Sequence, residues 1–469
     1  MKSVAIIGAG ITGLTASFYL QRRGFEVTVY EAGGRAGGVI QSIRSGGFLA
    51  ECGPNTLLET SPRIADLIED AGLASRRLYS DPKAEARYLV CHGRPVAMPN
   101  SPLQFITTKL FTAKTKLAVL REPFVPRRTN GTEESVADFV VRRLNREFLD
   151  RAIDALAAGV YAGDPYKLSL QQAFPRLAEL EGRYGSLIKG QIFGARERKA
   201  RGETARDRAP KFSFDEGLQV LPDTLASRLG GAIRLNTPVT KLAQTASGWR
   251  ISTPSGDMEY DAVVYCGTAY RLAELGFQTS RPLFPAAGKP APESRSTGFQ
   301  TFSEIRYPPV ASVVLGFRRE DVAHPCQGFG MLIPKLEGFK ILGTIFSSSL
   351  FPNRAPAGHV MLTSYVGGER QPDLASRPAD DLVALTCEDL RTLLGVKGQP
   401  VFCHTRLYPR AIPQYNLGYG GYRELMNEIE SHAAGLFLAG HYREGVSLGD
   451  SIVSGRNVVG RVENFLTAK

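Results

Sequence analysis

Residues 4–13 read Val-Ala-Ile-Ile-Gly-Ala-Gly-Ile-Thr-Gly, and this stretch decides the fold. Its apolar start is typical of a buried parallel strand, and a pattern of helical period follows the last glycine. Gly8 permits the tight turn, Gly10 lets the backbone approach a pyrophosphate, and Gly13 lets the helix pack closely on the strand. The N–H groups and positive dipole of the helix N-terminus would face the phosphates. The stretch therefore predicts a dinucleotide site.

The kind of dinucleotide follows from the next residues. A second strand at 25–30 ends at Glu31, where a carboxylate accepts hydrogen bonds from both ribose hydroxyls. This carboxylate argues against NADP, which carries a 2′-phosphate there. Residues 33–38, Gly-Gly-Arg-Ala-Gly-Gly, form a second glycine turn that a nicotinamide enzyme does not need. Because FAD runs deep into its protein and needs close backbone there, with Arg35 available to stabilise negative charge, the unit predicts FAD.

Composition narrows the class of protein. A chain of 469 residues with 43% hydrophobic and 22% charged residues predicts a globular protein of two or three domains. No stretch reaches the roughly 18 uninterrupted apolar residues of a membrane span. The first strand begins by residue 4, which leaves no room for a signal peptide and predicts a cytoplasmic chain. The six cysteines form no CxxC pair, so disulfides and zinc sites are not expected.

The net charge of +11 favours an anionic substrate, an anionic membrane surface or a merely basic solvated surface. Nucleic acid is not expected as a partner, because the sequence contains no nucleic-acid-binding motif. A basic, apolar segment at 103–124 either covers a hydrophobic core, which is the commoner case, or contacts a membrane surface. The basic stretch at 196–211 reads as solvated, and 281–298 reads as a linker.

The order of patterns predicts an α/β fold with a discontinuous cofactor domain. A hairpin at 87–98 and short β-type runs after 298 indicate an antiparallel sheet, and a buried strand at 435–440 precedes a helix at 448–466. We expect an FAD-binding Rossmann-like domain built from 1–80, 212–295 and 418–469, a substrate domain from 81–98 and 296–417, and a helical domain at 99–211.

Three further groups of motifs occur in order along the chain. Residues 53–56 read Gly-Pro-Asn-Thr and 157–165 read Ala-Ala-Gly-Val-Tyr-Ala-Gly-Asp-Pro; 328–334 read Gly-Phe-Gly-Met-Leu-Ile-Pro, with Leu-Gly-Thr-Ile-Phe-Ser-Ser at 342–348; 439–442 read Ala-Gly-His-Tyr, with Gly-Val-Ser-Leu at 445–448. With these motifs the chain resembles, over nearly its full length, the oxygen-dependent protoporphyrinogen oxidases of haem biosynthesis, a family related to flavin amine oxidases and phytoene desaturases. The resemblance implies non-covalent FAD, and it implies oxidation of protoporphyrinogen IX to protoporphyrin IX with O2 as acceptor, giving H2O2.

The resemblance also implies roles for particular residues. The cofactor set is Gly8, Ala9, Gly10, Ile11, Thr12, Gly13, Glu31, Ala32, Arg35, Gly38, Val39, Gly53, Pro54, Asn55, Thr56, Val239, Gly440, Val446, Ser447 and Leu448. Val239 would contact adenine from the strand after Thr237-Pro238, and Val446 to Leu448 would face the flavin pyrimidine edge from a helix N-terminus. No catalytic side chain is assigned, because the flavin itself accepts the hydride.

Four residues are implied for the porphyrinogen. Arg87 would pair with a propionate, Gly159 would let backbone approach the flat macrocycle, and Leu332 and Phe346 would line the ring. Leu332 and Phe346 are equally well explained as core residues. His441 stands where many relatives have asparagine.

Several alternatives stay open at this point. The substrate could be coproporphyrinogen III, which carries two more propionates. A flavin amine oxidase or carotenoid desaturase is less favoured, because the tyrosines and the single Trp249 give no clear aromatic cage. A non-catalytic escort-type protein is disfavoured by the intact glycines at both flavin-contacting ends. A homodimer and peripheral membrane contact both remain open.

Overall fold

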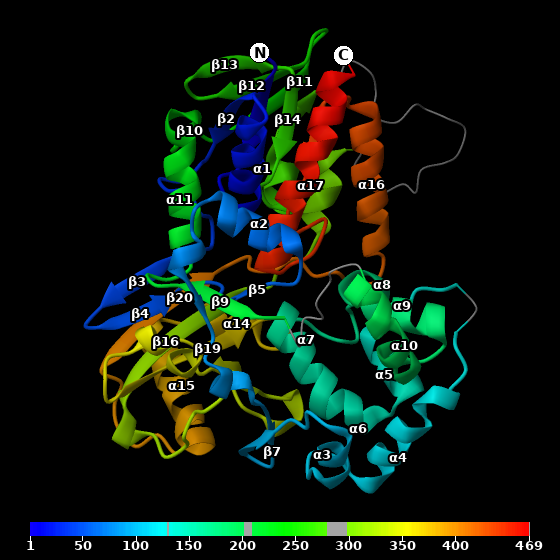
Figure 1. The fold of residues 1–469 in the computed structure, drawn as a ribbon, viewed down its shortest axis with the longest axis vertical. Helices are drawn as coiled ribbons and strands as arrows, with labels where there is room; N and C mark the ends of the chain where they lie inside the picture. Colours follow the sequence, from blue (N-terminus) through cyan, green and yellow to red (C-terminus); the bar gives the residue numbers. More distant parts are fainter. Residues whose placement is uncertain (129–130, 201–208, 279–297, 469) are drawn as a thin grey trace.

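The computed structural model describes residues 1–128, 131–200, 209–278 and 298–468. Much of the basic stretch at 196–211 and nearly all of the predicted linker at 281–298 lie outside the described residues. Figure 1 shows three bodies: a sheet flanked by long helices near both termini, a second sheet with α15 below it, and a group of shorter helices beside that second sheet.

A five-stranded parallel sheet occupies the part of the molecule that contains both termini (Figure 1). Its strands, in spatial order, are β10 (Ile233–Arg234), β2 (Glu26–Tyr30), β1 (Ser3–Ile7), β14 (Ala262–Tyr265) and β21 (Leu436–Leu438). All of the neighbouring pairs are parallel. Strands from the start, the middle and the end of the chain therefore join in one sheet, and their carboxyl ends meet at one edge.

Two helices pack on each other beside this sheet because glycines let their backbones approach. They are α1 (Ile11–Arg22) and α17 (Leu448–Thr467). A Cβ atom on Gly455 of α17 would stand 2.4 Å from the Thr12 carbonyl oxygen of α1. On its other side α1 approaches the turn after β1, since a Cβ on Gly13 would stand 2.0 Å from the Gly8 oxygen. The Thr12 hydroxyl donates to the Ser451 oxygen at 3.0 Å and joins the two helices. Helices α11 (Val220–Leu229), α2 (Pro62–Asp70) and α16 (Tyr419–His432) complete this part.

A four-stranded sheet extends the cofactor part of the chain. Its order is β13 (Gly256–Tyr260), β12 (Trp249–Thr253), β11 (Lys241–Gln244) and β15 (Gly276–Gln278). Val239 was expected within the strand at 238–242, but β11 begins only at Lys241. The residues before it form a loop instead, because the Thr237 N–H donates to the Glu31 oxygen at 2.8 Å and is drawn toward the end of β2.

The second large sheet has seven strands. Their order is β20 (Phe402–Tyr408), β16 (Val310–Arg318), β19 (His359–Gly367), β18 (Ile341–Ile345), β17 (Gly330–Leu332), β7 (Arg87–Cys91) and β8 (Arg94–Ala97). The hairpin predicted at 87–98 is β7 and β8. The sheet is not wholly antiparallel, since β17 runs parallel to β7, a strand that comes from a distant part of the chain. Helix α15 (Ala379–Leu394), which the sequence reading missed, packs into the core on one face.

Smaller sheets connect these bodies. β3 (Ser42–Ser45) pairs with β4 (Phe48–Glu51), and β9 (Lys211–Phe214) lies between β5 (Leu57–Leu58) and β6 (Arg77–Tyr79). They lie between the two large sheets in Figure 1.

The segment between β8 and β9 is helical, as its pattern predicts. Its α-helices are α3 (Pro102–Thr107), α4 (Ala113–Arg121), α5 (Val136–Arg143), α6 (Arg146–Phe148), α7 (Asp154–Tyr161), α8 (Leu170–Ala173), α9 (Pro175–Tyr184) and α10 (Leu187–Ala200). Arg143 is fully buried here and bridges the carboxylates of Glu122 and Glu181. Within the described residues, no helix is both long and apolar enough to cross a membrane.

Candidate flavin and substrate site

The predicted cofactor residues converge at the carboxyl edge of the parallel sheet. Gly8 has a left-handed φ of +104°, which makes the turn after β1, and its N–H donates to the Tyr30 oxygen at the end of β2. A side chain on Gly10 would meet nothing within 4 Å, and no side chain caps the first turn of α1. The first N–H groups of α1 therefore face open space, as an anion site requires.

The second glycine turn lies against the first. The Gly37 N–H donates to the Ala9 oxygen at 2.8 Å, and a Cβ on Gly38 would lie 3.4 Å from the Gly10 Cα. The Glu31 carboxylate accepts from the N–H groups of Ala9 (2.9 Å) and Gly33 (2.7 Å), which fixes its oxygens between the two turns. The structure thus brings together both glycine turns and the carboxylate that the sequence selected.

Arg35 has a more local role than its charge suggests. Its guanidinium donates to the carbonyl oxygens of Ala36, Gly38 and Ile40, all within its own turn. These bonds close the second glycine turn, while neighbouring Ala32 and Val39 stay exposed.

The loop at 53–56 and the start of α17 complete the edge. A Cβ on Gly53 would stand 2.3 Å from the Val39 oxygen, so only glycine lets this loop follow the second turn so closely. Pro54 and Thr56 are half-buried, and Asn55 is buried. Gly440, with φ of +120°, follows β21, and the nearest atoms to a Cβ there include the carbonyl oxygen of Gly267, after β14.

One backbone N–H group at the N-terminus of α17 is already hydrogen-bonded within the helix's own cap. Ser447 and Asp450 form a capping box, in which the Asp450 carboxylate accepts the Ser447 N–H at 3.2 Å. The Ser447 N–H is therefore not available to a flavin, whereas the box leaves the N–H groups of Leu448 and Gly449 unused. Val446 is half-buried against the core that includes Tyr442.

His441 lies in the turn between Gly440 and α17. Its ring packs edge-on against Tyr307, with centroids 5.9 Å apart. Burial lowers the pKa of the imidazole to about 4, so the group is neutral at neutral pH.

The predicted substrate residues meet one face of the seven-stranded sheet. Arg87 of β7 is paired with Gly330 of β17, two residues before Leu332. Leu332 is paired with Gly343 of β18. Gly343 is in turn paired with Tyr365 of β19. Since paired residues project to the same side, Arg87, Leu332 and Tyr365 share a face. Gly159 of α7 lies over it, because a Cβ there would stand 2.6 Å from the Leu332 Cδ2.

Arg87 is half-buried, with its guanidinium 5.8 Å from the centroid of the Phe329 ring. Among the described residues it has no ion-pair partner. An arginine held on an apolar face without a carboxylate is arranged to bind an anionic group from outside.

Phe346 is not on this face. It is fully buried, and its ring packs against Tyr88 and His324 in the core on the opposite side of the sheet, next to α15. Ile345, the last residue of β18, is paired with Gly330 and therefore projects to the same side of the sheet as Arg87. Phe346 comes next in the chain and projects to the opposite side. The core-packing interpretation of Phe346 agrees with this position.

Tyr365 is the residue of the site that the sequence reading missed. Its hydroxyl accepts from the Asn55 Nδ2 at 2.7 Å and donates to the Gly53 oxygen at 3.4 Å. It therefore joins the cofactor loop to the substrate face. Alternation along β19 could have placed it on the same side as Thr363, but only the pairing of β17, β18 and β19 connects it with Leu332.

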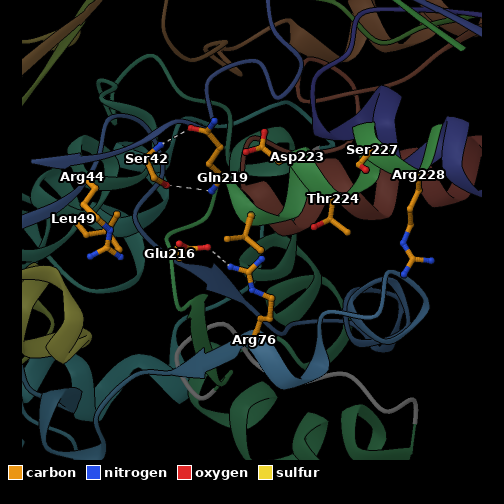
Figure 2. A pocket seen from close by; sticks show the side chains of 11 residues that line it. Ser42, Arg44, Leu49, Arg76, Glu216, Gln219, Asp223, Thr224, Ser227 and Arg228 are labelled. Atoms are coloured by element: carbon orange, nitrogen blue, oxygen red, sulfur yellow. Dashed lines mark hydrogen bonds and ion pairs between the residues drawn. The ribbon is translucent and has the colours of Figure 1, made fainter. Parts of the chain in front are cut away.

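A cavity of about 650 Å³ lies elsewhere, as Figure 2 shows. It is lined by Ser42, Arg44, Leu49, Arg76, Glu216, Gln219, Val220, Asp223, Thr224, Ser227 and Arg228. None of the predicted cofactor or substrate residues lines it. Charges of both signs surround it, and Arg76 is already paired with Glu216. We assign it no role in the site.

Comparisons with known proteins place this geometry in a family. Residues 11–463 match the model of the flavin-containing amine oxidoreductases. The chain belongs to this family. It is thus a flavin-dependent oxidoreductase.

The similarity to individual relatives covers almost the whole chain. Protoporphyrinogen oxidase 2, chloroplastic/mitochondrial, from Arabidopsis thaliana is 34% identical, covering 99% of this chain and 94% of its own length. Coproporphyrinogen III oxidase from Bacillus subtilis is 28% identical, covering 99% and 98%. A solved structure from Exiguobacterium sp. 255-15 superposes with a TM-score of 0.79 at 23% sequence identity and covers 99% of both chains. Reduced UDP-galactopyranose mutase superposes with a TM-score of 0.71 at 15% sequence identity, covering 99% of this chain and 94% of its own. Structures this distant show the shared fold alone.

Proposed function

We propose that the protein oxidises protoporphyrinogen IX to protoporphyrin IX with O2 as acceptor, releasing H2O2. The full-length similarity to relatives named protoporphyrinogen oxidase supports this proposal. The observation that carries it is Arg87, a guanidinium with no ion-pair partner among the described residues, on the sheet face that also bears Leu332 and Tyr365 and is approached by Gly159. A flat, largely apolar ring with a carboxylate at its margin fits that combination.

Little acid–base chemistry is required of the chain. The carbon that is oxidised in a porphyrinogen is activated by adjacent electron-rich pyrroles, and bound FAD would accept the hydride equivalents and pass electrons to O2. The protein residues would contribute by holding the porphyrinogen in the right orientation against the flavin. Arg87 would fix the orientation through the propionate, Leu332 would contact one face of the ring, and Tyr365 would meet the ring where the sheet borders the cofactor loop.

We further propose that the flavin is FAD, bound without a covalent bond. The open space at Gly10, the uncapped start of α1 and the carboxylate of Glu31 fit a dinucleotide. The sheets support the proposed domains: the parallel sheet takes strands from 1–80, 212–295 and 418–469, and the seven-stranded sheet takes strands from 81–98 and 296–417.

Coproporphyrinogen III is the second candidate substrate, and relatives named coproporphyrinogen III oxidase support it. Its four propionates would call for several cations on the substrate face. Near Leu332 Arg87 has no ion-pair partner among the described residues, while Arg370 close by is engaged by Asp154 at 2.6 Å. Arg406 of β20 projects to the same side as Tyr365 through Ser312, and it too has no ion pair among the described residues. We favour protoporphyrinogen because the relatives named for its oxidation are more similar to this chain, at up to 34% identity against 28%.

Aerobic turnover of the two porphyrinogens, followed by porphyrin fluorescence against an enzyme-free control, tests the proposal. We expect rapid growth with protoporphyrinogen and a higher kcat/KM than with coproporphyrinogen. A flavin-loaded protein that gives no growth above autoxidation with either would overturn it and favour an amine oxidase or desaturase activity. Denaturation should release free FAD into the supernatant, and flavin that stays on the chain would contradict non-covalent binding.

The Arg87→Ala variant should bind porphyrinogen less well. Loss of a charged hydrogen-bonded pair costs about 1–3 kcal/mol, so we expect KM to rise by roughly 5- to 150-fold with a smaller change in kcat. Steady-state kinetics with protoporphyrinogen measures this.

The matched control is Arg94→Ala, in the same hairpin on the exposed edge strand β8. It removes the same charge from the protein, and it should leave KM unchanged. Equal KM values for both variants would remove Arg87 from the site.

We also propose that the helical segment contacts anionic membranes. Large apolar side chains are exposed along it: Leu103 (71%), Ile106, Leu117, Leu120 (60%), Phe124 (83%), Ile192 and Phe193. Lys116 of α4 donates to the Ile106 oxygen of α3, and the Lys189 ammonium of α10 lies 6.0 Å from the centroid of the Phe124 ring, which follows α4. The exposed side chains therefore belong to segments that contact one another. Leu110 and Phe111 of the same segment are buried, so the segment both covers a core and exposes apolar side chains.

The double variant Leu120→Glu/Phe124→Glu should lose this contact. Removing two apolar side chains and adding two negative charges should weaken binding to phosphatidylglycerol vesicles by roughly tenfold or more. Vesicle sedimentation measures it. Met258→Glu, an exposed apolar residue on β13, should bind like the wild type, and equal binding by all three proteins would refute membrane contact through this surface.

A further inference from the structure

The turn between β21 and α17 leads directly to the residues proposed to face the flavin. It runs from Gly440 to Gly445, whose φ angles are +120° and +130°. Inside the turn, the N–H groups of Arg443 and Glu444 donate to the Gly440 oxygen at 3.0 and 3.2 Å. These bonds close the turn as far as Glu444 and do not include Gly445, which leads into Val446 and α17.

The side chain of Tyr415 forms hydrogen bonds to both sides of this turn. The Tyr415 hydroxyl donates to the His441 oxygen at 2.5 Å and accepts from the Gly445 N–H at 3.0 Å, so a single phenol bridges both ends of the turn. Tyr419, at the start of α16, donates its hydroxyl to the Tyr442 oxygen at 2.5 Å. Two neighbouring phenols thus bind consecutive carbonyl groups of the same turn.

The two phenols are rigidly placed. Both tyrosines are buried, and their ring centroids are 4.3 Å apart. The Arg423 guanidinium lies 5.1 Å from the centroid of the Tyr415 ring. Burial raises the pKa of Tyr415 to about 12, so its hydroxyl keeps the proton that it donates.

The backbone around Tyr415 is anchored as well. The Ser169 N–H donates to the Tyr415 oxygen at 2.9 Å, and the Leu417 N–H donates to the Lys167 oxygen at 2.8 Å. The phenol therefore extends from a strap that is itself hydrogen-bonded to the helical segment. A side chain so fixed transmits its position to whatever its hydroxyl binds.

We propose that Tyr415, with Tyr419 beside it, is a positioning residue for the flavin. Its hydroxyl fixes the turn at 441–445 and thereby holds Val446 and the first N–H groups of α17 in place against the cofactor. This inference rests on the proposed FAD site and is independent of which substrate is oxidised.

The Tyr415→Phe variant of the full chain tests the proposal without substrate. Removing the hydroxyl leaves the Gly445 N–H and the His441 carbonyl without their partner, so we expect the dissociation constant for FAD to rise by roughly 5- to 30-fold. The visible spectrum of the bound flavin should change and its midpoint potential should fall, because a displaced helix N-terminus stabilises the anionic reduced flavin less. Hydrogen exchange should accelerate at 441–447.

The matched control is Tyr422→Phe, on helix α16 with Tyr419, whose hydroxyl contacts Glu304 at 3.3 Å instead of the turn. It should keep wild-type affinity, spectrum and potential. If Tyr415→Phe does not fold, Tyr419→Phe should show the same changes at smaller size. Wild-type FAD affinity, spectrum and potential in the folded Tyr415→Phe variant would overturn the proposal. So would faster exchange throughout the chain with an unaltered flavin spectrum, which would mean a general structural role.

Discussion

The Gly13→Ala variant should lose its flavin and much of its stability. The added Cβ would lie 2.0 Å from the Gly8 oxygen and 3.2 Å from the Ile6 Cγ2, so α1 would have to move away from β1. Overpacking against backbone, which cannot rotate aside, should lower the free energy of unfolding by about 3 kcal/mol or more. Because the same movement separates the α1 N-terminus from the second glycine turn, the purified protein should be colourless.

A glycine in α17 supplies the control. A Cβ on Gly460 would meet nothing within 4 Å, so Gly460→Ala should keep FAD and stabilise the helix by about 0.5–1 kcal/mol. Flavin absorbance per chain and chemical denaturation measure both variants. A Gly13→Ala protein with full flavin content would show that α1 does not carry the phosphate site.

The Arg354→Leu variant should be among the most destabilised. Arg354 and Glu51 form an ion pair at 3.1 Å with only 1% of either side chain exposed. The pair joins β4 to the segment after β18, and Ser42 and the Leu218 N–H also donate to the Glu51 carboxylate. Removal of the guanidinium leaves a buried carboxylate uncompensated, which should lower the free energy of unfolding by about 3–5 kcal/mol. Gly53 lies two residues beyond Glu51, so FAD affinity should fall as well.

The loss of unfolding free energy in Arg354→Leu should depend on pH. Burial already raises the pKa of Glu51, and without Arg354 the pKa should rise further. A carboxyl whose pKa is higher in the folded state than in the unfolded state destabilises the fold as pH rises from the unfolded pKa through the folded one. The difference in unfolding free energy between variant and wild type should therefore grow from acid toward neutral pH.

Arg76→Ala is the matched control, because its ion pairs with Asp215 and Glu216 are largely exposed. Exposed pairs contribute about 0–1 kcal/mol. Urea denaturation at several pH values compares the two variants. A loss below 1 kcal/mol in Arg354→Leu would mean that the buried pair does not hold β4 in place.

The cofactor edge was predictable because its signals are local. Gly8, Gly10 and Gly13 serve one strand–turn–helix unit, and Glu31 comes directly after the next strand. The backbone geometry of such a unit is dictated by neighbouring residues, and the structure has the left-handed turn and the close approach that the glycines imply. The position of Val239 was less certain from sequence, because β11 begins three residues later than its pattern suggests.

The substrate face was only partly predictable. Phe346 and Tyr365 are both aromatic residues in apolar runs, and sequence does not say which side of a sheet each faces. The register of β17, β18 and β19 puts Tyr365 beside Leu332, whereas Phe346 packs under α15. A shift of one residue would exchange these faces, so the assignment depends on strand pairing and not on residue type.

The sequence by itself determined the dinucleotide unit and the family, since both reside in contiguous motifs whose residues act on their immediate neighbours. Only the tertiary structure decided that Tyr365 joins the cofactor loop to the substrate face, that Tyr415 bridges the ends of the turn before α17, and that Arg354 meets Glu51 in the interior. Each of these contacts joins residues far apart in the chain. Their distances and registers are set by the packing of whole sheets and helices, which no local pattern encodes.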